Sequence, residues 1–514
     1  MKLLTSSQIR SIDKTVIEER GISGLMLMER AGTSITEQII NRYNPSCAAV
    51  FIGKGNNGGD GSVVARALFE RGVDVVVFVA TEPDSIQGDA RVKYERIPES
   101  VLKINLYSDS SMVESLPEKL ASCSCIIDGL LGTGIDGEVR GLYKTVIDAI
   151  NVSDKPVIAI DIPSGLQSDT GRWEGVCIKA DVTVTMGAPK IGLYINDAYK
   201  VTGEVVVADI GFPQDMFENP EFKTNLTTHS FVSSLFHKRD RASHKGNYGH
   251  LFVLSGSRGF TGAATLLAES AIRTGVGLVT VGVPKSLNPI FEVKLTEAMT
   301  LPLYETTEQT LSSSCFKEIE DFSEKVKAIA MGPGLSTHPD TVKLIKKVLL
   351  EVDKSMVVDA DGINAMDLKV LSALSSKESS TILTPHPKEL SRLIKKDVKD
   401  IQEDRIKTAT EIAVSYKIYL VLKGFRTIIA APDGTVFLND TGNPGMAKGG
   451  SGDVLTGIIG SLLAQGFTPF HSAICGVYIH GLAGDYAAKE LTENAMIPTD
   501  MIRYLPKVFQ SFFA

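Results

Sequence analysis

The sequence has little cysteine, a single tryptophan, and no apolar run long enough to span a bilayer. None of the six cysteines is paired with histidine at the spacing of a zinc site, and most lie in apolar runs; they are Cys47, Cys123, Cys125, Cys177, Cys315 and Cys475. This usage is typical of a reducing compartment. The opening MKLLTSSQIR lacks both a secretory apolar core and an Arg-rich presequence. We therefore expect a cytoplasmic protein with no membrane partner.

Tracts rich in lysine and arginine are also missing, and the net charge is −8. A protein whose main partner is a nucleic acid usually carries a basic surface, so we expect no nucleic-acid partner. An anionic ligand must then be bound locally, by backbone N–H groups and a few lysines.

The 514 residues are 43% apolar and 22% charged, which suits a soluble chain with more than one core. Two successive patterns alternate strands with helical segments, and several strands are unbroken apolar runs. Such runs are typical of parallel strands that are buried on both faces. The strands expected in the first pattern, after helical residues Ser6 to Tyr43, are Ala48–Gly53, Val73–Ala80, Cys125–Asp128, Val157–Asp161, Val182–Met186 and Val205–Asp209.

The second pattern begins at Leu251 and ends with an expected hairpin. The expected strands are Leu251–Ser255, Gly277–Val283, Ala328–Met331, Met356–Asp359, Thr381–Thr384, Leu420–Lys423, Thr427–Ala431 and Thr435–Asn439. The last two flank Pro432-Asp433-Gly434, a turn signal. Residues 212–225 have little periodicity and contain two prolines, so we place a domain boundary near residue 220. We predict two α/β domains, 1–220 and 221–514.

The segment GKGNNGGDG (53–61) follows a strand and precedes a helix expected from Ser62 to Arg71. Glycines there allow close approach of the backbone to a ligand, although a tight turn with Asn/Asp capping is the alternative. Asp128 and Asp161 each end a predicted strand, and Ser164 follows. Because the ligand crevice of an open parallel sheet lies at the carboxyl ends of its strands, we expect the three loops to converge.

The segment GNPGMAKGGSGD (442–453) is the strongest signal in the chain and precedes an apolar helix from Val454. Its last glycines expose successive N–H groups that form an anion site, aided by the helix dipole. Asp453 would lie beside a phosphate bound there; an N-cap role is the alternative.

The first half resembles the NAD(P)H-hydrate epimerase domain, through GxGNNGGDG, DGLLGTG, DIPSG and TMGAPKIG. The resemblance implies a Rossmann-like three-layer sandwich with Asp161 as the acid/base. It also implies potassium ligands Asn57, Asp128 and Ser164, whose oxygens suit a hard monovalent cation. The residues implied to bind hydrated NADH or NADPH are Asn56, Asn57, Gly58, Gly59, Asp60, Gly132, Thr133, Gly134, Ile135, Asp136, Gly137, Glu138 and Asp161.

The second half is similar to the ribokinase-like ADP- or ATP-dependent NAD(P)H-hydrate dehydratases, through HKGNYGHLFVLSGS, MGPGL, VVDADGIN, TPHPKEL, VLKGFRT and NPGMAKGGSGD. The resemblance implies Asp453 as catalytic base. It implies dinucleotide binding by Gly334, His386, Pro387, Lys388, Glu389 and Asp453. The implied nucleotide-binding residues are Lys423, Gly424, Phe425, Arg426, Thr427, Asn443, Pro444, Gly445, Met446, Ala447, Lys448, Gly449, Gly450, Ser451 and Gly452.

Asp359, Asp361 and Glu389 are further pocket candidates, through Mg²⁺, although each could instead cap a strand end. For His386, which lies between two prolines, a loop histidine is the alternative. For a chain in which the two halves are fused, the resemblance implies ADP as phosphoryl donor, with ATP the alternative. Leu25, Met28 and Ala31 of the opening helices could pack on a partner chain or on the sheet, and we expect a homo-oligomer.

The resemblance as a whole predicts a metabolite-repair enzyme that epimerises hydrated NADH and NADPH and dehydrates the S form. Two other functions remain open. The chain could be an ATP-dependent kinase of a small hydroxylated metabolite, which explains the first half poorly. The first half could instead be a regulatory dinucleotide-binding module, although a binder needs neither Asp161 nor the ion site.

Overall fold

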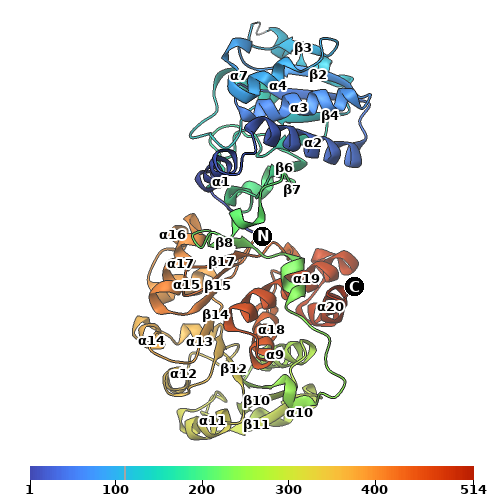
Figure 1. Ribbon diagram of the computed structural model, residues 1–514. Coiled ribbons are helices and arrows are strands. Elements are labelled where there is room, and N and C mark those ends of the chain that lie inside the picture. Colours follow the sequence, from blue (N-terminus) through green and yellow to red (C-terminus); the bar gives the residue numbers. More distant parts are fainter. Residues whose placement is uncertain (109–110, 514) are drawn as a thin grey trace. The chain divides into compact units, whose positions relative to one another are not determined.

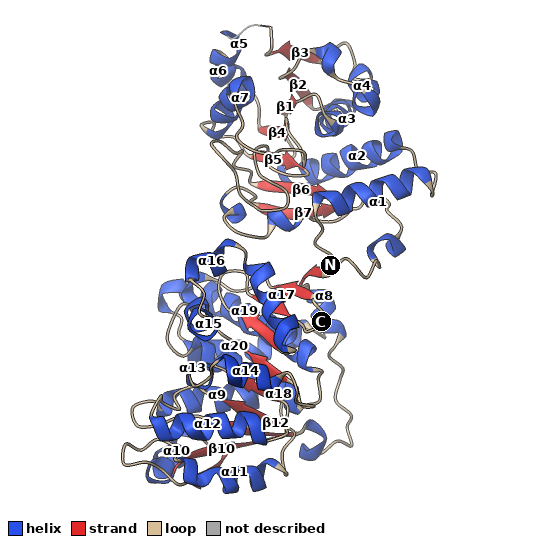
Figure 2. Ribbon diagram, turned by 90° about the vertical axis from the view of Figure 1, so that its left-hand side faces the viewer, coloured by secondary structure: helices blue, strands red, loops and turns tan. Residues whose placement is uncertain are grey.

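The computed structural model describes residues 1–108 and 111–513 and divides them into two compact units. The first is Lys2–Thr224; the second comprises Met1 and Asn225–Ala514. The α/β class expected for both halves is confirmed (Figures 1 and 2). Within the described residues no helix combines the length and apolar character needed to cross a bilayer, and all six cysteines are free thiols.

The N-terminal unit is built on a sheet of seven strands that all run parallel. In sheet order the strands are β3 (Leu102–Asn105), β2 (Asp74–Val79), β1 (Cys47–Ile52), β4 (Cys125–Gly129), β5 (Val157–Ile160), β6 (Val182–Met186) and β7 (Glu204–Ala208). The helices are α1 (Ser6–Glu18), α2 (Gly24–Tyr43), α3 (Asn56–Glu70), α4 (Gly88–Glu95), α5 (Ser111–Glu114), α6 (Leu116–Ala121) and α7 (Gly141–Asn151).

Both faces of this sheet are covered, which explains its apolar strands. Val50 and Ile52 of β1 belong to one buried cluster, with residues of α2 and α3. Ala49 and Phe51 belong to the cluster on the opposite face, with residues of α6 and α7. Successive side chains of a strand point to opposite faces, so a strand buried on both sides has no polar alternation.

The C-terminal unit has a ten-stranded sheet that is parallel except near its hairpin edge. In sheet order the strands are β11 (Met299–Leu303), β10 (Leu278–Pro284), β9 (His250–Leu254), β12 (Ala328–Met331), β13 (Met356–Val358), β14 (Thr381–Leu383), β15 (Tyr419–Leu422), β16 (Ile428–Ala430), β17 (Val436–Leu438) and β8 (Thr224–Leu226). The expected β16–β17 hairpin is confirmed, with Ile428 opposite Leu438 and Gly434 at φ +83° in the turn.

The helices of this unit lie before, between and after the strands. They are α8 (His229–Ser234), α9 (Thr261–Arg273), α10 (Asn288–Lys294), α11 (Phe316–Ser323), α12 (Pro339–Glu351), α13 (Asp361–Asn364), α14 (Leu368–Leu374), α15 (Pro387–Ile394), α16 (Val398–Glu403), α17 (Arg405–Tyr416), α18 (Ser451–Ala464), α19 (Pro469–Ala495) and α20 (Pro498–Ser511). Residues of α9, α18 and α19 share the main apolar cluster with the central strands.

Three local features complete what the sequence indicated. The opening helices are α1 and α2, separated where Gly21 has φ +70° and Ser23 caps α2. Met28 and Ala31, for which packing on the sheet or on a partner had been left open, are buried inside the unit. The short strands β3, β8 and β11 were not anticipated, since their few residues have no clear apolar run.

The glycine segment after β1 is also not the expected loop, because α3 begins at Asn56 rather than Ser62. Its glycines serve close packing. A Cβ on Gly58 would lie 2.1 Å from the carbonyl oxygen of Gly53, and one on Gly61 would lie 2.9 Å from Ile52 Cγ2. Only glycine therefore allows the first turns of α3 to pack this tightly on the strand end.

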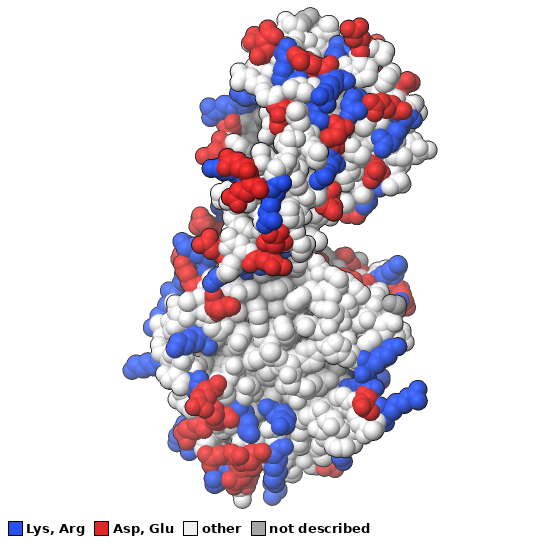
Figure 3. Space-filling model, in the orientation of Figure 1, with Lys and Arg blue, Asp and Glu red and all other residues white. Residues whose placement is uncertain are grey.

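Charges of both signs are intermixed on the face of the N-terminal unit in Figure 3, with no continuous basic track there. The middle of the C-terminal unit carries few charges in the same view.

We expect Gly457→Ala to destabilise the C-terminal unit by about 1–3 kcal/mol, the usual range for overpacking. A Cβ there would lie 2.0 Å from Ser270 Oγ and 2.3 Å from the Leu267 carbonyl oxygen, where α18 crosses α9. Gly262→Ala in α9 is the matched control, since its Cβ would meet nothing within 4 Å. Thermal unfolding followed by circular dichroism measures both; equal melting temperatures would contradict the packing argument.

Candidate active sites of the two units

In the N-terminal unit the loops that follow β1, β4 and β5 lie at the carboxyl edge of one parallel sheet, as expected. The neighbouring loop after β6 lies at this edge as well. The four loops bring together two groups of polar side chains, one around Asp128 and one around Asp161.

The first group joins the three residues expected to hold a cation. Asp128 is fully buried; its carboxylate accepts hydrogen bonds from the Ser164 backbone N–H (2.8 Å) and hydroxyl (2.6 Å). Asn57 donates from Nδ2 to the Leu131 carbonyl (2.9 Å), and the Leu131 N–H donates to Ser164 Oγ (2.9 Å). Burial raises the pKa of Asp128 to about 6. A buried carboxylate among oxygen atoms, without a basic partner, fits a cation site.

The second group is centred on Asp161, which has φ +64° and is 8% exposed. Its Oδ1 accepts hydrogen bonds from Thr185 Oγ1 (3.1 Å), from the Met186 N–H (3.3 Å) and from the Lys190 ammonium. Left-handed backbone at a non-glycine residue is strained and clusters at functional sites. These partners come from the next strand and loop, so Asp161 does not cap its own turn.

Lys190 is the residue that sequence reasoning missed in this site. It lies within the TMGAPKIG motif, yet nothing in the spacing distinguishes it from a surface lysine. The structure leaves it 1% exposed, with Nζ bonded to Asp161 and 3.2 Å from Thr185 Oγ1. A fully buried ammonium requires a charged partner, and Asp161 supplies it.

The expected dinucleotide-binding segments differ in accessibility. Asn56 is exposed, whereas Asn57, Gly58, Gly59 and Asp60 are buried in α3. Burial and the Asp161 charge raise the pKa of Asp60 well above its usual value. Every residue from Gly132 to Glu138 is at least partly accessible, so this loop offers the larger contact surface.

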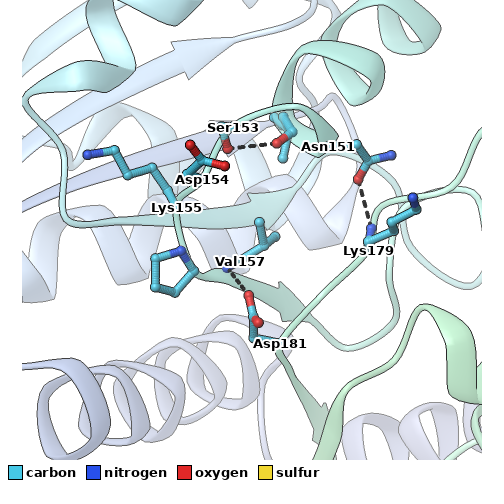
Figure 4. A pocket seen from close by; sticks show the side chains of 9 residues that line it. Asn151, Ser153, Asp154, Lys155, Val157, Lys179 and Asp181 are labelled. Atoms are coloured by element: carbon cyan, nitrogen blue, oxygen red, sulfur yellow. Dashed lines mark hydrogen bonds between the residues drawn. The ribbon is translucent and has the colours of Figure 1, made fainter.

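A pocket of about 320 Å³ lies at the opposite, amino end of β5 and β6 (Figure 4). Its polar groups have protein partners: the Val157 N–H donates to Asp181 (2.8 Å), and the Lys179 N–H donates to Asn151 Oδ1 (2.9 Å). These bonds tie the strand ends together, and no expected site residue lines this pocket.

In the C-terminal unit Gly450, at φ +98°, is the N-cap of α18. Asp453 lies in the first turn and is not the N-cap residue; the α18 N-cap makes no side-chain hydrogen bond. The capping alternative is therefore wrong. Burial, and secondarily the charge of Asp359, raises the pKa of Asp453 to about 6. The N-terminus of α18 can bind an anion. A carboxylate with this pKa can act as a general base.

A buried ion pair lies beneath this turn. Lys423 Nζ donates to Asp359 Oδ1 (2.6 Å), and Thr456 Oγ1 donates to Asp359 Oδ2 (3.0 Å). A Cβ on Gly452 would lie 3.3 Å from Asp359 Oδ2, so the glycine lets the helix start touch the pair. Lys423 thus faces Asp359, whereas Phe425 in the same expected nucleotide segment is 58% exposed.

The expected magnesium ligands do not form a cluster; among the described residues no three His, Cys, Asp or Glu could hold a metal ion. Asp359 is paired with Lys423, and Asp361 accepts a hydrogen bond from the Ser336 N–H (2.9 Å). Glu389 belongs to a capping box with His386, whose Nδ1 accepts the Lys388 and Glu389 N–H groups. His386 and Glu389 therefore cap the start of α15, a role that the sequence reasoning did not anticipate.

Asp485 on α19 is a second residue that the sequence reasoning missed. Its carboxylate accepts hydrogen bonds from the Gly442 N–H (2.9 Å) and from Asn443 Nδ2 (2.9 Å). Asn443 Oδ1 in turn accepts the Gly445 N–H (3.0 Å). Asp485 therefore holds the start of the expected nucleotide segment, although it lies about forty residues further along the chain.

Comparison with known proteins matches each unit to a family. Residues 24–192 match the family described as YjeF-related protein N-terminus, and residues 251–507 match NAD(P)H-hydrate dehydratase. The bifunctional NAD(P)H-hydrate repair enzyme of Moorella thermoacetica is 41% identical over 517 residues, which cover 99% of this chain and 97% of that protein. The protein of the same name from Escherichia coli is 33% identical, with 98% and 93% covered.

Among solved structures, the ADP/ATP-dependent NAD(P)H-hydrate dehydratase from Bacillus subtilis, co-crystallised with ATP and Mg²⁺, is 32% identical. The match covers 56% of this chain and 98% of that one, with a TM-score of 0.49.

We expect Asp485→Ala to release the segment around Gly442. Loss of a hydrogen bond to a charged group costs roughly 1.5–3 kcal/mol, so exchange of the Gly442 amide should accelerate at least about tenfold. Lys489→Ala, one turn further along α19 and exposed, is the control. Hydrogen–deuterium exchange of peptides covering residues 440–448 measures the effect, and unchanged protection in Asp485→Ala would refute the anchoring role.

Proposed function

The chain belongs to the family of bifunctional NAD(P)H-hydrate repair enzymes, and we propose that it restores hydrated NADH and NADPH in two steps. The N-terminal unit interconverts the R and S hydrates. The C-terminal unit dehydrates the S form with ADP as phosphoryl donor. The observation that carries this proposal is that each unit has an aspartate–lysine pair at the carboxyl edge of a parallel sheet, Asp161–Lys190 and Asp359–Lys423. Asp161 is itself the proposed base, and in the other unit the proposed base, Asp453, lies within reach of the charge of Asp359.

Epimerisation inverts the hydroxyl-bearing carbon next to the ring nitrogen of the reduced nicotinamide. The C–O or C–N bond at that carbon must open and re-form, and a proton must leave and return to oxygen or nitrogen. Asp161 takes and returns this proton, so the site ends each turnover in its starting state. Lys190, bonded to the same carboxylate oxygen as Thr185 and Met186, holds Asp161 in place.

The hydrated dinucleotide lies along the carboxyl edge, against Asn56 and the accessible loop from Gly132 to Glu138. The buried part of the glycine segment, Asn57 to Asp60, supports this surface from below. The glycines allow the start of α3 to approach the strand end, and the α3 N-terminus favours a phosphate.

Potassium fits the pocket formed by Asn57, Asp128 and Ser164, because all three offer oxygen atoms and Asp128 has no basic partner among its bonded groups. When bound, the ion supplies positive charge close to the anionic dinucleotide. Asp128 holds the β4–β5 loops together through Ser164 whether it is ionised or protonated.

Dehydration needs a better leaving group than hydroxide. Asp453 accepts the hydroxyl proton of the S hydrate as the oxygen attacks the β-phosphorus of ADP, and AMP leaves. The backbone N–H groups at the start of α18 stabilise the charge on the transferring phosphoryl group. Loss of phosphate from the ring carbon, with a proton from the adjacent carbon, then yields NADH or NADPH.

The nucleotide is bound by the segments Gly424–Thr427 and Asn443–Gly452, with Lys423 positioned below by Asp359. Mg²⁺ would supply positive charge to the phosphates of the bound nucleotide. The hydrate lies against Gly334 and the His386–Glu389 turn, which the capping box keeps rigid. ATP is the alternative donor, with ADP as its product.

The proposal is tested by recovery of reduced-nicotinamide absorbance from mixed R and S hydrate with ADP, Mg²⁺ and K⁺. We expect nearly full recovery by the unaltered chain and recovery of the S fraction alone by Asp161→Asn. Asp453→Asn should bind ADP, measured by calorimetry, and dehydrate at least about 100-fold more slowly, the smallest usual contribution of a general base.

Full recovery by Asp161→Asn would remove the epimerase role from that residue. No recovery by the unaltered chain with either nucleotide, together with phosphorylation of a small hydroxylated metabolite, would instead establish the kinase alternative.

Potassium should stabilise the N-terminal unit. A ligand at a hundredfold excess over its Kd adds about 2.7 kcal/mol to the folded state. We expect the melting temperature to rise when potassium chloride replaces choline chloride at constant ionic strength, and Asp128→Asn and Ser164→Ala to lose this rise. Asp154→Asn, exposed at the other end of the sheet, is the control. The same melting temperature in both salts would exclude a potassium site.

A further inference from the structure

Arg405, the first residue of α17, donates hydrogen bonds to the turn that joins β15 to β16. Its Nη1 donates to the Phe425 carbonyl (2.5 Å). Its Nη2 donates to the carbonyls of Leu422 (3.1 Å) and Lys423 (3.3 Å). One guanidinium thus holds three backbone carbonyls of the segment that leads into and forms Gly424–Thr427, which we propose to bind the nucleotide.

Gly424 is the residue that leaves room for this guanidinium. Its φ is +149°, and a Cβ on it would lie 2.8 Å from Arg405 Nη2. Its own carbonyl accepts a hydrogen bond from Thr427 Oγ1 (3.0 Å). The carbonyls of residues 422 to 425 are therefore all bonded to side chains, three of them to the same one.

The bonded carbonyls also fix the direction of the N–H groups of the turn. In a planar trans peptide the carbonyl and the N–H point to opposite sides. Because three carbonyls point to Arg405, the N–H groups of the residues that follow them, at positions 423, 424 and 426, point away from it. The N–H of Lys423 donates to the Pro385 carbonyl (2.9 Å). The positive ends of three peptide dipoles thus lie on the side of the turn opposite Arg405, where they favour an anion.

The side chain of Lys423 links this turn to the start of α18. Its Nζ donates to Asp359 and would lie 3.4 Å from a Cβ on Gly452, in the first turn of α18. The N–H groups at that helix start also favour an anion. Two sets of backbone donors are therefore connected through one lysine side chain.

The place of Arg405 in the fold is costly in electrostatic terms. The N-terminus of a helix disfavours a cation. Burial lowers the pKa of Arg405 to about 10, so the guanidinium is still charged near neutral pH. In the part of the chain that the structure describes, its hydrogen bonds all go to backbone carbonyls, and its Nε is buried without a partner. Stability alone does not account for a charged side chain in these surroundings.

We propose that Arg405 is a positioning residue of the nucleotide site, which holds the carbonyls of the turn so that the positive ends of its peptide dipoles face the anionic part of ADP. This inference rests on the proposed function, in which the turn binds the nucleotide. The guanidinium adds its own positive charge behind the turn. Arg405 exchanges no proton and forms no bond with either substrate, so the balance of the reaction is unchanged.

The test measures ADP binding to the full chain by calorimetry, with Mg²⁺ present, and the kinetics of dehydration of the S hydrate. A lysine is a point charge without the planar fork that holds several carbonyls at once. We therefore expect Arg405→Lys to raise the Kd and the KM for ADP about tenfold or more, the usual effect of losing a hydrogen bond to a charged group. The kcat at saturating ADP and the KM for the S hydrate should stay the same, because the interaction serves binding alone.

Arg405→Ala gives a second measurement that a general loss of structure would not reproduce. Guanidinium chloride, at concentrations well below those that unfold proteins, should restore ADP affinity to Arg405→Ala and leave that of the unaltered chain the same. Lys407→Gln, an exposed residue of the same helix, is the matched control and should bind ADP as the unaltered chain does. Epimerisation by the other unit should be equal in all variants.

Equal ADP affinity in Arg405→Lys, Arg405→Ala and the unaltered chain would overturn the inference, and so would a fall in kcat with no change in the KM for ADP. If the unaltered chain binds neither ADP nor ATP, the proposed nucleotide site is wrong, and this inference with it.

Discussion

Each unit depends on a lysine–aspartate pair at a strand end, in which the lysine is fully buried in one unit and 20% exposed in the other. Lys190 pairs with Asp161 in one unit, and Lys423 pairs with Asp359 in the other. Removing either partner would leave an uncompensated buried charge, which is strongly destabilising. The loops that carry these residues must therefore close on one another, and that closure assembles the rest of each site.

The two pairs differ in what they do to the proposed proton carrier. In the N-terminal unit the paired aspartate, Asp161, is itself the proposed base. In the C-terminal unit the pair lies beneath the helix start, and a separate carboxylate, Asp453, takes the proton. The charge of Asp359 raises the pKa of Asp453, while Lys423 lowers it, so the pair adjusts a neighbour that burial has already shifted. A lysine–aspartate ion pair thus contributes to both sites, in a different way in each.

Glycine contributes through close contact at both helix starts. In the N-terminal unit Gly58 and Gly61 let α3 touch the end of β1, and in the C-terminal unit Gly452 lets α18 touch the Asp359–Lys423 pair. The first motif was expected to be a loop as far as Ser62, whereas α3 begins at Asn56. The second motif was expected to lead into a helix, and α18 begins at Ser451. In both units the free N–H groups of a helix start therefore face the site.

The sequence by itself determined the α/β class, most central strands and the residues at their carboxyl ends. A strand that is buried on both faces is an unbroken apolar run in the sequence, and a polar residue marks the point where such a strand ends. Asp128 and Asp161 could be chosen in this way, and Asp453 could be chosen from its place between a glycine segment and an apolar helix. Lys190 and Asp485 could not, since a lysine or aspartate on a helix or loop has the same local pattern whether it is solvated or buried. Only the tertiary structure decided their roles, by placing each beside a charge or backbone group remote in sequence.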